Sequence, residues 1–266
     1  MNFYSSQKGL TLIEVMISVT MGLLFLTAAL GYLVTSQQSF RAQDTGTRIQ
    51  ENARFSMDIL RHNIRMAGYS DNLTIAPAYI YREACGANNP CADDTATNQG
   101  DRLAVAMVSP DAEDCLGNDL GTDTHVANVF WVETVGGISS LYCRGWDVEN
   151  SSWHSASQPL VDGVDQMQVQ YGVYSAATDS IDRYLNATGV EALANGWDNV
   201  QSVRVALLVQ SGQDTDDADT SGNTVADATF AANYTTFTLL DGAAYTPGDQ
   251  RIRRVFTNTV AINNAL

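Results

Sequence analysis

The sequence predicts an α+β fold in which one long N-terminal helix packs on an antiparallel β-sheet head. In the chain of 266 residues, positions 10–67 keep a helical pattern that no turn signal interrupts. After residue 70 the apolar residues alternate with polar ones, and clusters of Asn, Asp, Gly and Ser separate the alternating segments. A long helix followed by a series of strands is the element order typical of α+β domains.

The first part of the predicted helix is apolar on every side. The twenty residues from Val15 to Val34 carry no charge, and as a helix they would span about 30 Å, enough to cross a hydrocarbon core. A core helix of a soluble domain is disfavoured because the stretch lacks a polar face. An ordinary signal peptide is disfavoured because the apolar run continues into a helical polar segment. We expect residues 10–34 to insert into a membrane.

The second part of the helix is amphipathic. Small and apolar residues recur at steps of three and four, which predicts one buried stripe made of Ile49, Ala53, Ser56, Leu60, Ile64 and Ala67. Phe55, Ile59 and Met66 are expected to widen this stripe. Gly68 stands where a C-terminal glycine ends a helix. We therefore predict a helix over 10–67 whose second half packs on its own domain.

The head is predicted over residues 68–266 as an antiparallel sheet across which the stripe lies. Alternating or apolar segments predict strands at Leu103–Val108, Val129–Glu133, Ser139–Tyr142, Met167–Val173, Val203–Val209, Tyr234–Leu240 and Arg254–Ile262. A brief helix is expected at Gly189–Ala194.

The charge is divided unevenly along the chain. The net charge is −16, from 14 basic and 30 acidic residues, but positions 1–70 hold six basic and four acidic residues. The remaining residues hold 8 basic and 26 acidic side chains, a net of −18. Phosphate contacts need clustered positive charge, so we expect no nucleic-acid binding by the head. The negative charge favours solubility.

One acidic residue interrupts the apolar segment. Residues 8–15 read K-G-L-T-L-I-E-V and place Glu14 at the start of the stretch that must enter lipid. An unpaired carboxylate there costs several kcal/mol, so it needs a partner or must be neutral. If the chain were cut after Gly9, the new amine of Leu10 would be such a partner, because residues one and five of a helix share a face.

These residues closely resemble the class III signal of type IV prepilins and type II secretion pseudopilins. The resemblance implies that 1–9 is a leader peptide and that a prepilin peptidase cuts after Gly9. It also implies that Leu10, which stands where the family usually has phenylalanine, is then N-methylated. Glu14 corresponds to the conserved glutamate of the family motif.

Further segments resemble the PilW family of type IV pilus minor pilins: R-M-A-G-Y at 65–69, W-D-N-V-Q-S-V-R-V-A-L-L-V at 197–209, and R-R-V-F-T-N-T-V-A-I-N-N at 253–264. The resemblance covers the first and the last seventy residues. It implies a minor pilin of a Gram-negative bacterium, held in the inner membrane by 10–34 with a periplasmic head. Its partners would be other minor pilins, the major pilin and the inner-membrane assembly platform.

The same resemblance implies a role in a tip complex that primes pilus assembly, with the head ending outside the cell. Two alternatives remain at this stage. One is a minor pseudopilin of type II secretion, which shares the N-terminal signal motif and the apolar helix. The other is a membrane-anchored adhesin that binds calcium.

The four cysteines all fall in the head, at Cys85, Cys91, Cys115 and Cys143. A periplasmic head lies in a compartment where disulfides persist. Three pairings are possible, of which we favour Cys85–Cys91 together with Cys115–Cys143. The alternative is a zinc site, but C-x5-C lacks the common ligand spacing and has no adjacent histidine.

An acidic segment at 213–224 is the one candidate metal site. Asp217, Asp219 and Ser221, followed by a glycine, reproduce the start of a twelve-residue calcium loop. The twelfth position is Ala228 instead of glutamate, and Asp227 comes one residue early. The alternative is a solvated turn without metal. We predict no other cofactor.

No catalytic residue is predicted. The three histidines are scattered at His62, His125 and His154, and the sequence contains none of the common motifs for nucleophilic, phosphate-binding or zinc-hydrolase chemistry. The expected role is therefore structural rather than enzymatic.

Overall fold

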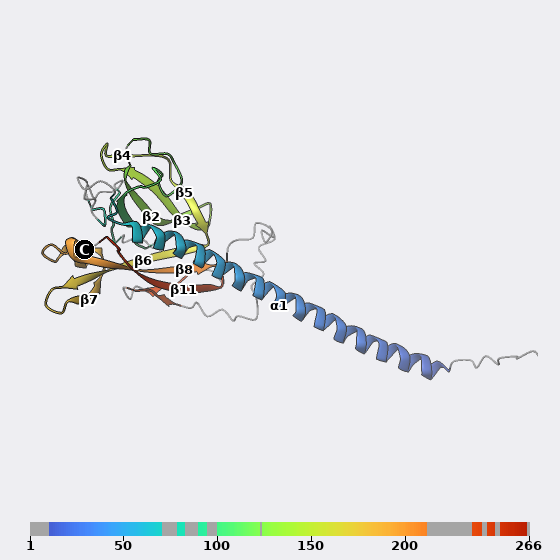
Figure 1. Cartoon of the computed structure of the whole chain (residues 1–266). Helices are drawn as coiled ribbons and strands as arrows, with labels where there is room; N and C mark the ends of the chain where they lie inside the picture. Colours follow the sequence, from blue (N-terminus) through green and yellow to red (C-terminus); the bar gives the residue numbers. More distant parts are fainter. Residues whose placement is uncertain are drawn as a thin grey trace, which may run out of the picture. The chain divides into compact units, whose positions relative to one another are not determined.

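The computed structural model describes residues 11–70, 79–82, 90–94, 100–122, 124–211, 236–240, 244–247 and 251–264 (Figure 1). The chain forms two compact units, Met1–Thr47 and Arg48–Leu266. The helix α1, Leu12–Met66, contributes its first part to the first unit and its second part to the second.

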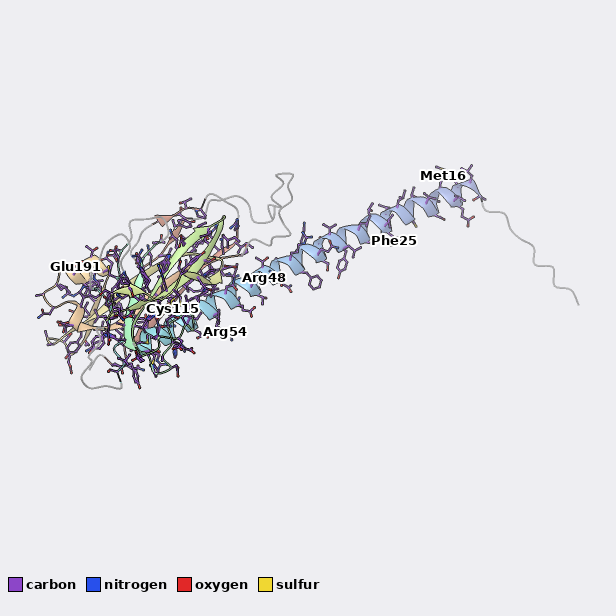
Figure 2. The ribbon with its side chains drawn as sticks, turned by 90° about the horizontal axis from the view of Figure 1, so that it is seen from above. Met16, Phe25, Arg48, Arg54, Cys115 and Glu191 are labelled. Carbon is purple, nitrogen blue, oxygen red and sulfur yellow. A yellow bond between two sulfur atoms is a disulfide. The ribbon has the colours of Figure 1, made fainter. Side chains whose placement is uncertain are left out.

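In the first unit, α1 exposes apolar side chains around its whole circumference. Its large exposed side chains include Leu12, Leu24 and Leu33. Met16 and Phe25 also project from the helix (Figure 2). By length and composition, α1 is the one helix in the described part of the chain able to span a membrane. A water-soluble helix would cover such a surface, so this unit is suited to lipid or to other apolar helices.

Several hydroxyl side chains in this unit bond to their own helix. The hydroxyl of Ser18 donates to the carbonyl oxygen of Glu14 at 2.7 Å, and that of Thr27 donates to Leu24 at 2.9 Å. Thr20 and Thr35 make the same kind of bond one turn back. Each hydroxyl is thus satisfied without water, as an apolar surrounding requires.

In the second unit, α1 packs by the predicted stripe. The residues Ile49, Ala53, Ser56, Leu60, Ile64 and Ala67 are all buried. Phe55 is an error of the prediction, because 56% of it remains exposed. The helix ends at Met66, and Gly68 adopts a φ of 74° while its N–H donates to Ala106 at 2.8 Å. This left-handed glycine is the C-terminal stop that the sequence indicates.

The first sheet of the head is antiparallel and has five strands. It contains β1 (Leu103–Val108), β2 (His125–Val135), β3 (Ile138–Asp147), β4 (Ser152–Trp153) and β5 (Gln158–Asp162). The spatial order is β1-β2-β3-β4, and β5 also pairs with β3. The long β2–β3 hairpin turns at two glycines with positive φ, Gly136 and Gly137.

The second sheet is antiparallel with the order β11-β8-β6-β7. Its strands are β6 (Val164–Ser175), β7 (Ser180–Leu185), β8 (Val200–Gln210) and β11 (Arg253–Ala261). The short α2 (Ala187–Glu191) and the 3₁₀ turn η1 (Trp197–Asn199) lie between β7 and β8, and β9 (Phe237–Thr238) pairs with β10 (Ala244–Tyr245).

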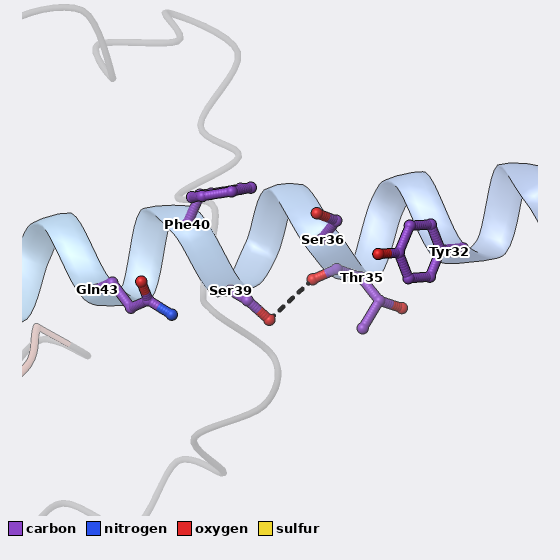
Figure 3. A pocket seen from close by; sticks show the side chains of 6 residues that line it. All are labelled: Tyr32, Thr35, Ser36, Ser39, Phe40 and Gln43. Carbon is purple, nitrogen blue, oxygen red and sulfur yellow. Dashed lines mark hydrogen bonds between the residues drawn. The ribbon is translucent and has the colours of Figure 1, made fainter.

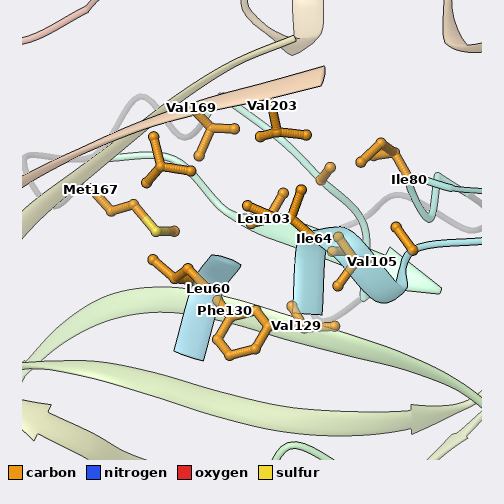
Figure 4. Packing of buried hydrophobic residues seen from close by; sticks show 14 of the residues in the cluster. Leu60, Ile64, Ile80, Leu103, Val105, Val129, Phe130, Met167, Val169 and Val203 are labelled. Atoms are coloured by element: carbon orange, nitrogen blue, oxygen red, sulfur yellow. The ribbon is translucent and has the colours of Figure 1, made fainter. Parts of the chain in front are cut away.

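The core lies where the α1 stripe meets both sheets (Figure 4). Leu60 and Ile64 pack in one cluster with Phe130 of the first sheet and with Met167 and Val203 of the second. The α+β class and the antiparallel head are confirmed. The described part of the head has two large sheets and the separate β9–β10 pair, where the strand pattern alone indicated one sheet. A strand's period does not reveal which sheet it joins.

The individual strands agree with the prediction to different degrees. The predicted Leu103–Val108 matches β1, whereas β2, β3, β6 and β8 extend beyond their predicted ends. The predicted Tyr234–Leu240 contains only β9 among its described residues, and the brief helix lies at Ala187–Glu191. The strands β4, β5, β7 and β10 were not predicted, because they are short or lack an apolar alternation.

Candidate functional site

The candidate assembly site is centred on Glu14, in the first turn of α1. Its side chain is exposed, and its own N–H donates to the carbonyl oxygen of Thr11 at 3.1 Å. In the described ranges, no cationic side chain pairs with the carboxylate. Gly9 and Leu10 lie outside the described residues, so the predicted cleavage and methylation positions remain predictions.

The Glu14 carboxylate lies at the edge of an apolar surface that carries no positive charge. The apolar side chains that follow it, from Val15 onward, are exposed in their unit. A carboxylate carried into lipid or among apolar helices loses its hydration, and a nearby amine or a proton would restore neutrality. The arrangement is therefore able to recruit a positively charged group into an otherwise apolar interface.

A pocket on α1 offers no chemistry. It is lined by six side chains of this one helix (Figure 3): Tyr32, Thr35, Ser36, Ser39, Phe40 and Gln43. The hydroxyl of Ser39 is already bonded to the carbonyl oxygen of Thr35 at 3.0 Å. The lining has no carboxylate, imidazole or thiol to transfer a proton or bind a metal.

In the described part of the head, the titratable group whose pKa is shifted most is a buried phenol. Burial raises the pKa of Tyr171 well above its ordinary value, and the carboxylates of Asp101 and Asp94 raise it further. This phenol therefore stays neutral and is out of reach of solvent. Within the described ranges, no three His, Cys, Asp or Glu residues are grouped to hold a metal ion.

The predicted calcium residues Asp217, Asp219, Ser221 and Asp227 all lie outside the described residues. The calcium site therefore remains a prediction from sequence.

A disulfide joins Cys115 to Cys143, with a Cα–Cα distance of 6.4 Å. This is one of the two pairings that the sequence favours. Cys143 lies fully buried in β3, and Cys115 lies in the loop between β1 and β2 (Figure 2). Cys91 is also disulfide-bonded, while Cys85 lies outside the described residues.

A chain of amide hydrogen bonds ties this disulfide loop to α1. The N–H of Cys115 donates to Oδ1 of Asn128 at 3.0 Å, and Nδ2 of Asn128 donates to Oδ1 of Asn63 at 2.9 Å. Asn63 and Asn128 are both buried. The sequence analysis missed this pair. Asn63 lies directly beside Ile64 of the stripe, and that position is the one local sign that it points inward.

Replacing both Cys115 and Cys143 by serine is expected to lower the free energy of unfolding of the head. The bond closes a loop with a sequence separation of 28, for which the chain-entropy model gives about 3–4 kcal/mol. Thermal unfolding of the full chain in detergent would measure this, with Thr122→Ser, an exposed position within the same loop, as the control. An unchanged melting temperature would contradict the expectation.

Comparisons with known proteins identify the family of this chain. The family model described as type IV pilus-assembly protein W matches residues 129–264, more than half of the chain. The model of the prokaryotic N-terminal methylation motif matches residues 4–30. A solved type IV-like pilin from Thermus thermophilus is 14% identical with a TM-score of 0.44, over 82% of this chain and 98% of the other. A search of curated proteins gives no significant match. The chain belongs to the PilW family and is a minor pilin of the type IV pilus.

Proposed function

We propose that this minor pilin is processed at the inner membrane of a Gram-negative bacterium and joins a tip complex that primes pilus assembly. The observation that supports this most is that the pilus-assembly family match and the methylation motif occur in one chain. They fall on the head and on an exposed apolar α1, respectively. Its partners are the prepilin peptidase, other minor pilins, the major pilin and the inner-membrane assembly platform.

Processing creates a positively charged amine that can pair with the Glu14 carboxylate. Cleavage after Gly9 by the prepilin peptidase leaves a positively charged amine on Leu10, which is then methylated. That amine on one subunit pairs with the Glu14 carboxylate of a neighbour, or of its own chain. Pairing removes the cost of a lone buried charge and sets the axial register between subunits.

The apolar part of α1 supplies the remaining contact. Before assembly residues 10–34 lie in lipid, and afterwards they pack against the same segments of other pilins. Since the hydroxyls of Ser18, Thr20 and Thr27 are bonded within the helix, these three groups need no new partner during this exchange. Close packing between helices then favours the filament.

The head has a structural role in this proposal. It moves from the periplasm to the outside of the cell at the pilus tip, and the net charge of −18 in residues 71–266 keeps it soluble there.

Deletion of the gene tests this function directly. We expect few or no surface pili by electron microscopy and loss of twitching, both restored by the intact gene on a plasmid. Normal pili combined with impaired protein secretion would instead identify a pseudopilin. Normal pili combined with impaired attachment would identify an adhesin and contradict a priming role.

Gly9→Leu tests the processing step. The bulkier side chain at the cleavage position is expected to leave the leader attached, and an immunoblot would show the longer precursor. Gly22→Ala is the matched control, because a Cβ at Gly22 meets no atom within 4 Å and it lies away from the cleavage position. Normal cleavage of the Gly9→Leu chain would contradict the proposed site.

A further inference from the structure

The strand β11 forms a long, exposed edge of the second sheet. It has nine residues and pairs with β8 on one side. The opposite edge strand, β7, has six residues, a register shift and a charged Asp182–Arg183 pair, all features that discourage further pairing. The outer edge of β1 is occupied, since Tyr81 bonds to Ala104 and Ala106 bonds to Tyr79. Of these three edges, β11 is the one that no strand or loop occupies within the described ranges.

The phase of hydrogen bonding along β11 identifies which backbone groups face outward. Ser211 donates to the carbonyl oxygen of Ile252 at 3.1 Å, and Ile262 donates to that of Gln201 at 2.9 Å. In an antiparallel ladder the residues that bond to the same neighbour alternate, so the even-numbered residues of β11 face β8. The N–H and C=O groups of Val255, Thr257, Thr259 and Ala261 therefore point away from the sheet. Among the described residues, none bonds to these groups.

The side chains of this edge suit strand pairing. Val255, Thr257, Thr259 and Ala261 are exposed, and the first three are β-branched. No acidic residue occurs from 253 to 261, and Arg254 is exposed. Because residues 71–266 carry a net charge of −18, a second copy of this head would be repelled. The edge instead favours a partner head that is less acidic.

The direction of β11 fits the packing of pilins. Near its end, Nδ2 of Asn264 donates to the carbonyl oxygen of Ala67 at 3.0 Å. Near its start, Arg253 forms an ion pair with Asp165. Three residues before Asp165, the carbonyl oxygen of Asp162 accepts a hydrogen bond from Nδ2 of Asn52 in α1. Within the head, β11 thus runs parallel to the second part of α1. A strand added along β11 would therefore lie along the same axis as α1, the direction shared by pilins whose α1 helices pack side by side.

We propose that the free edge of β11 binds an edge strand of a neighbouring, less acidic pilin head by β-strand addition. Main-chain hydrogen bonds from Val255, Thr257, Thr259 and Ala261 would extend the sheet into that subunit. The inference rests on the proposed function only in that it requires contact with other pilins.

A photo-crosslinking residue, p-benzoylphenylalanine, at Thr259 of the full chain tests the contact in cells that carry their own pilins. We expect a crosslinked product that mass spectrometry assigns to a strand of another pilin's head. The same residue at Asp58, on the exposed face of α1, serves as a control for nonspecific capture. A product formed only with a second copy of the chain, or no pilin product, would overturn the proposal.

Proline substitutions then test the hydrogen-bond pattern. Thr257→Pro removes an outward N–H, so it should leave the melting temperature nearly unchanged and reduce the Thr259 crosslink roughly tenfold. Thr257→Ala keeps the N–H and should keep the crosslink, whereas Asn258→Pro removes a bond to β8 and should destabilise the head. An undiminished crosslink in Thr257→Pro would overturn the proposal. If that variant fails to fold, the Thr259 crosslink in the unsubstituted chain decides alone.

The Glu14→Ala variant separates this proposal from the proposed function. If it abolishes pili while the Thr259 probe gives no pilin product in the parent chain, only the β11 contact is wrong. If Glu14→Ala leaves pili unchanged, the assembly mechanism itself is wrong, whatever the probe shows.

Discussion

Replacing Glu14 by alanine is expected to abolish pilus assembly while leaving cleavage after Gly9 intact. The variant keeps the apolar surface of α1 but removes the carboxylate that would neutralise a neighbour's terminal amine. That amine would then enter the apolar interface alone, at a cost of several kcal/mol. Electron microscopy would count the pili, and an immunoblot would confirm that the chain is processed and present.

Glu51→Ala is the matched control for this variant. Glu51 is exposed on the same helix, so its removal should leave pili unchanged. Pili in normal number on cells with Glu14→Ala would refute the neutralisation mechanism.

The second large effect is expected at the buried ion pair of Arg253 and Asp165. Nε of Arg253 lies 2.5 Å from Oδ2 of Asp165, and the two side chains are 2% and 3% exposed. A further guanidinium nitrogen of Arg253 donates to Oε1 of Gln210 at 3.1 Å. Asp165→Ala leaves a buried cation without its carboxylate, so the free energy of unfolding should fall by about 3–5 kcal/mol. Denaturant unfolding of the full chain in detergent would measure it.

An exposed ion pair provides the comparison. Asp58 lies 3.0 Å from Arg61 on α1, and both side chains are more than half exposed. Because water screens such a pair, Asp58→Ala should cost less than about 1 kcal/mol. An equal loss of unfolding free energy in Asp165→Ala and Asp58→Ala would show that burial does not determine how much these ion pairs stabilise the protein. A double variant, Asp165→Leu with Arg253→Met, should recover part of the loss.

Local patterns in the sequence predict the helix well. The stripe from Ile49 to Ala67 and the stop at Gly68 follow from period and from a glycine's freedom at positive φ. Phe55 was assigned inward because it flanks the stripe, but a helix buries only the arc that its neighbours cover.

Long-range pairing could not be predicted in the same way. Which of the two sheets a strand joins depends on partners that its own alternation does not specify. The same holds for polar groups in the core: Asn63 and Asn128 are 65 residues apart, and Asp165 and Arg253 are 88 residues apart. Each looks like a surface residue until its partner is known. Asp165 also lies at a register shift in β6, between Val164 and Gln166, where no simple alternation holds.

The candidate site shows the same difference between local features, which the sequence predicts, and long-range contacts, which it does not. Glu14 was predicted because a carboxylate is conspicuous in an apolar run, and the motif around it is short and contiguous. The amide chain from Cys115 to Asn63 was missed because it joins three elements that are distant in sequence.

The hydroxyl bonds within α1 bear on the reversibility of assembly. Ser18, Thr20, Thr27 and Thr35 keep their partners in the helix itself, so these groups do not distinguish a lipid from a protein surrounding. A preference for one surrounding over the other must then come from other groups, among them the apolar side chains and Glu14. Moving a subunit between lipid and a helical bundle, in either direction, would therefore break none of these four hydrogen bonds.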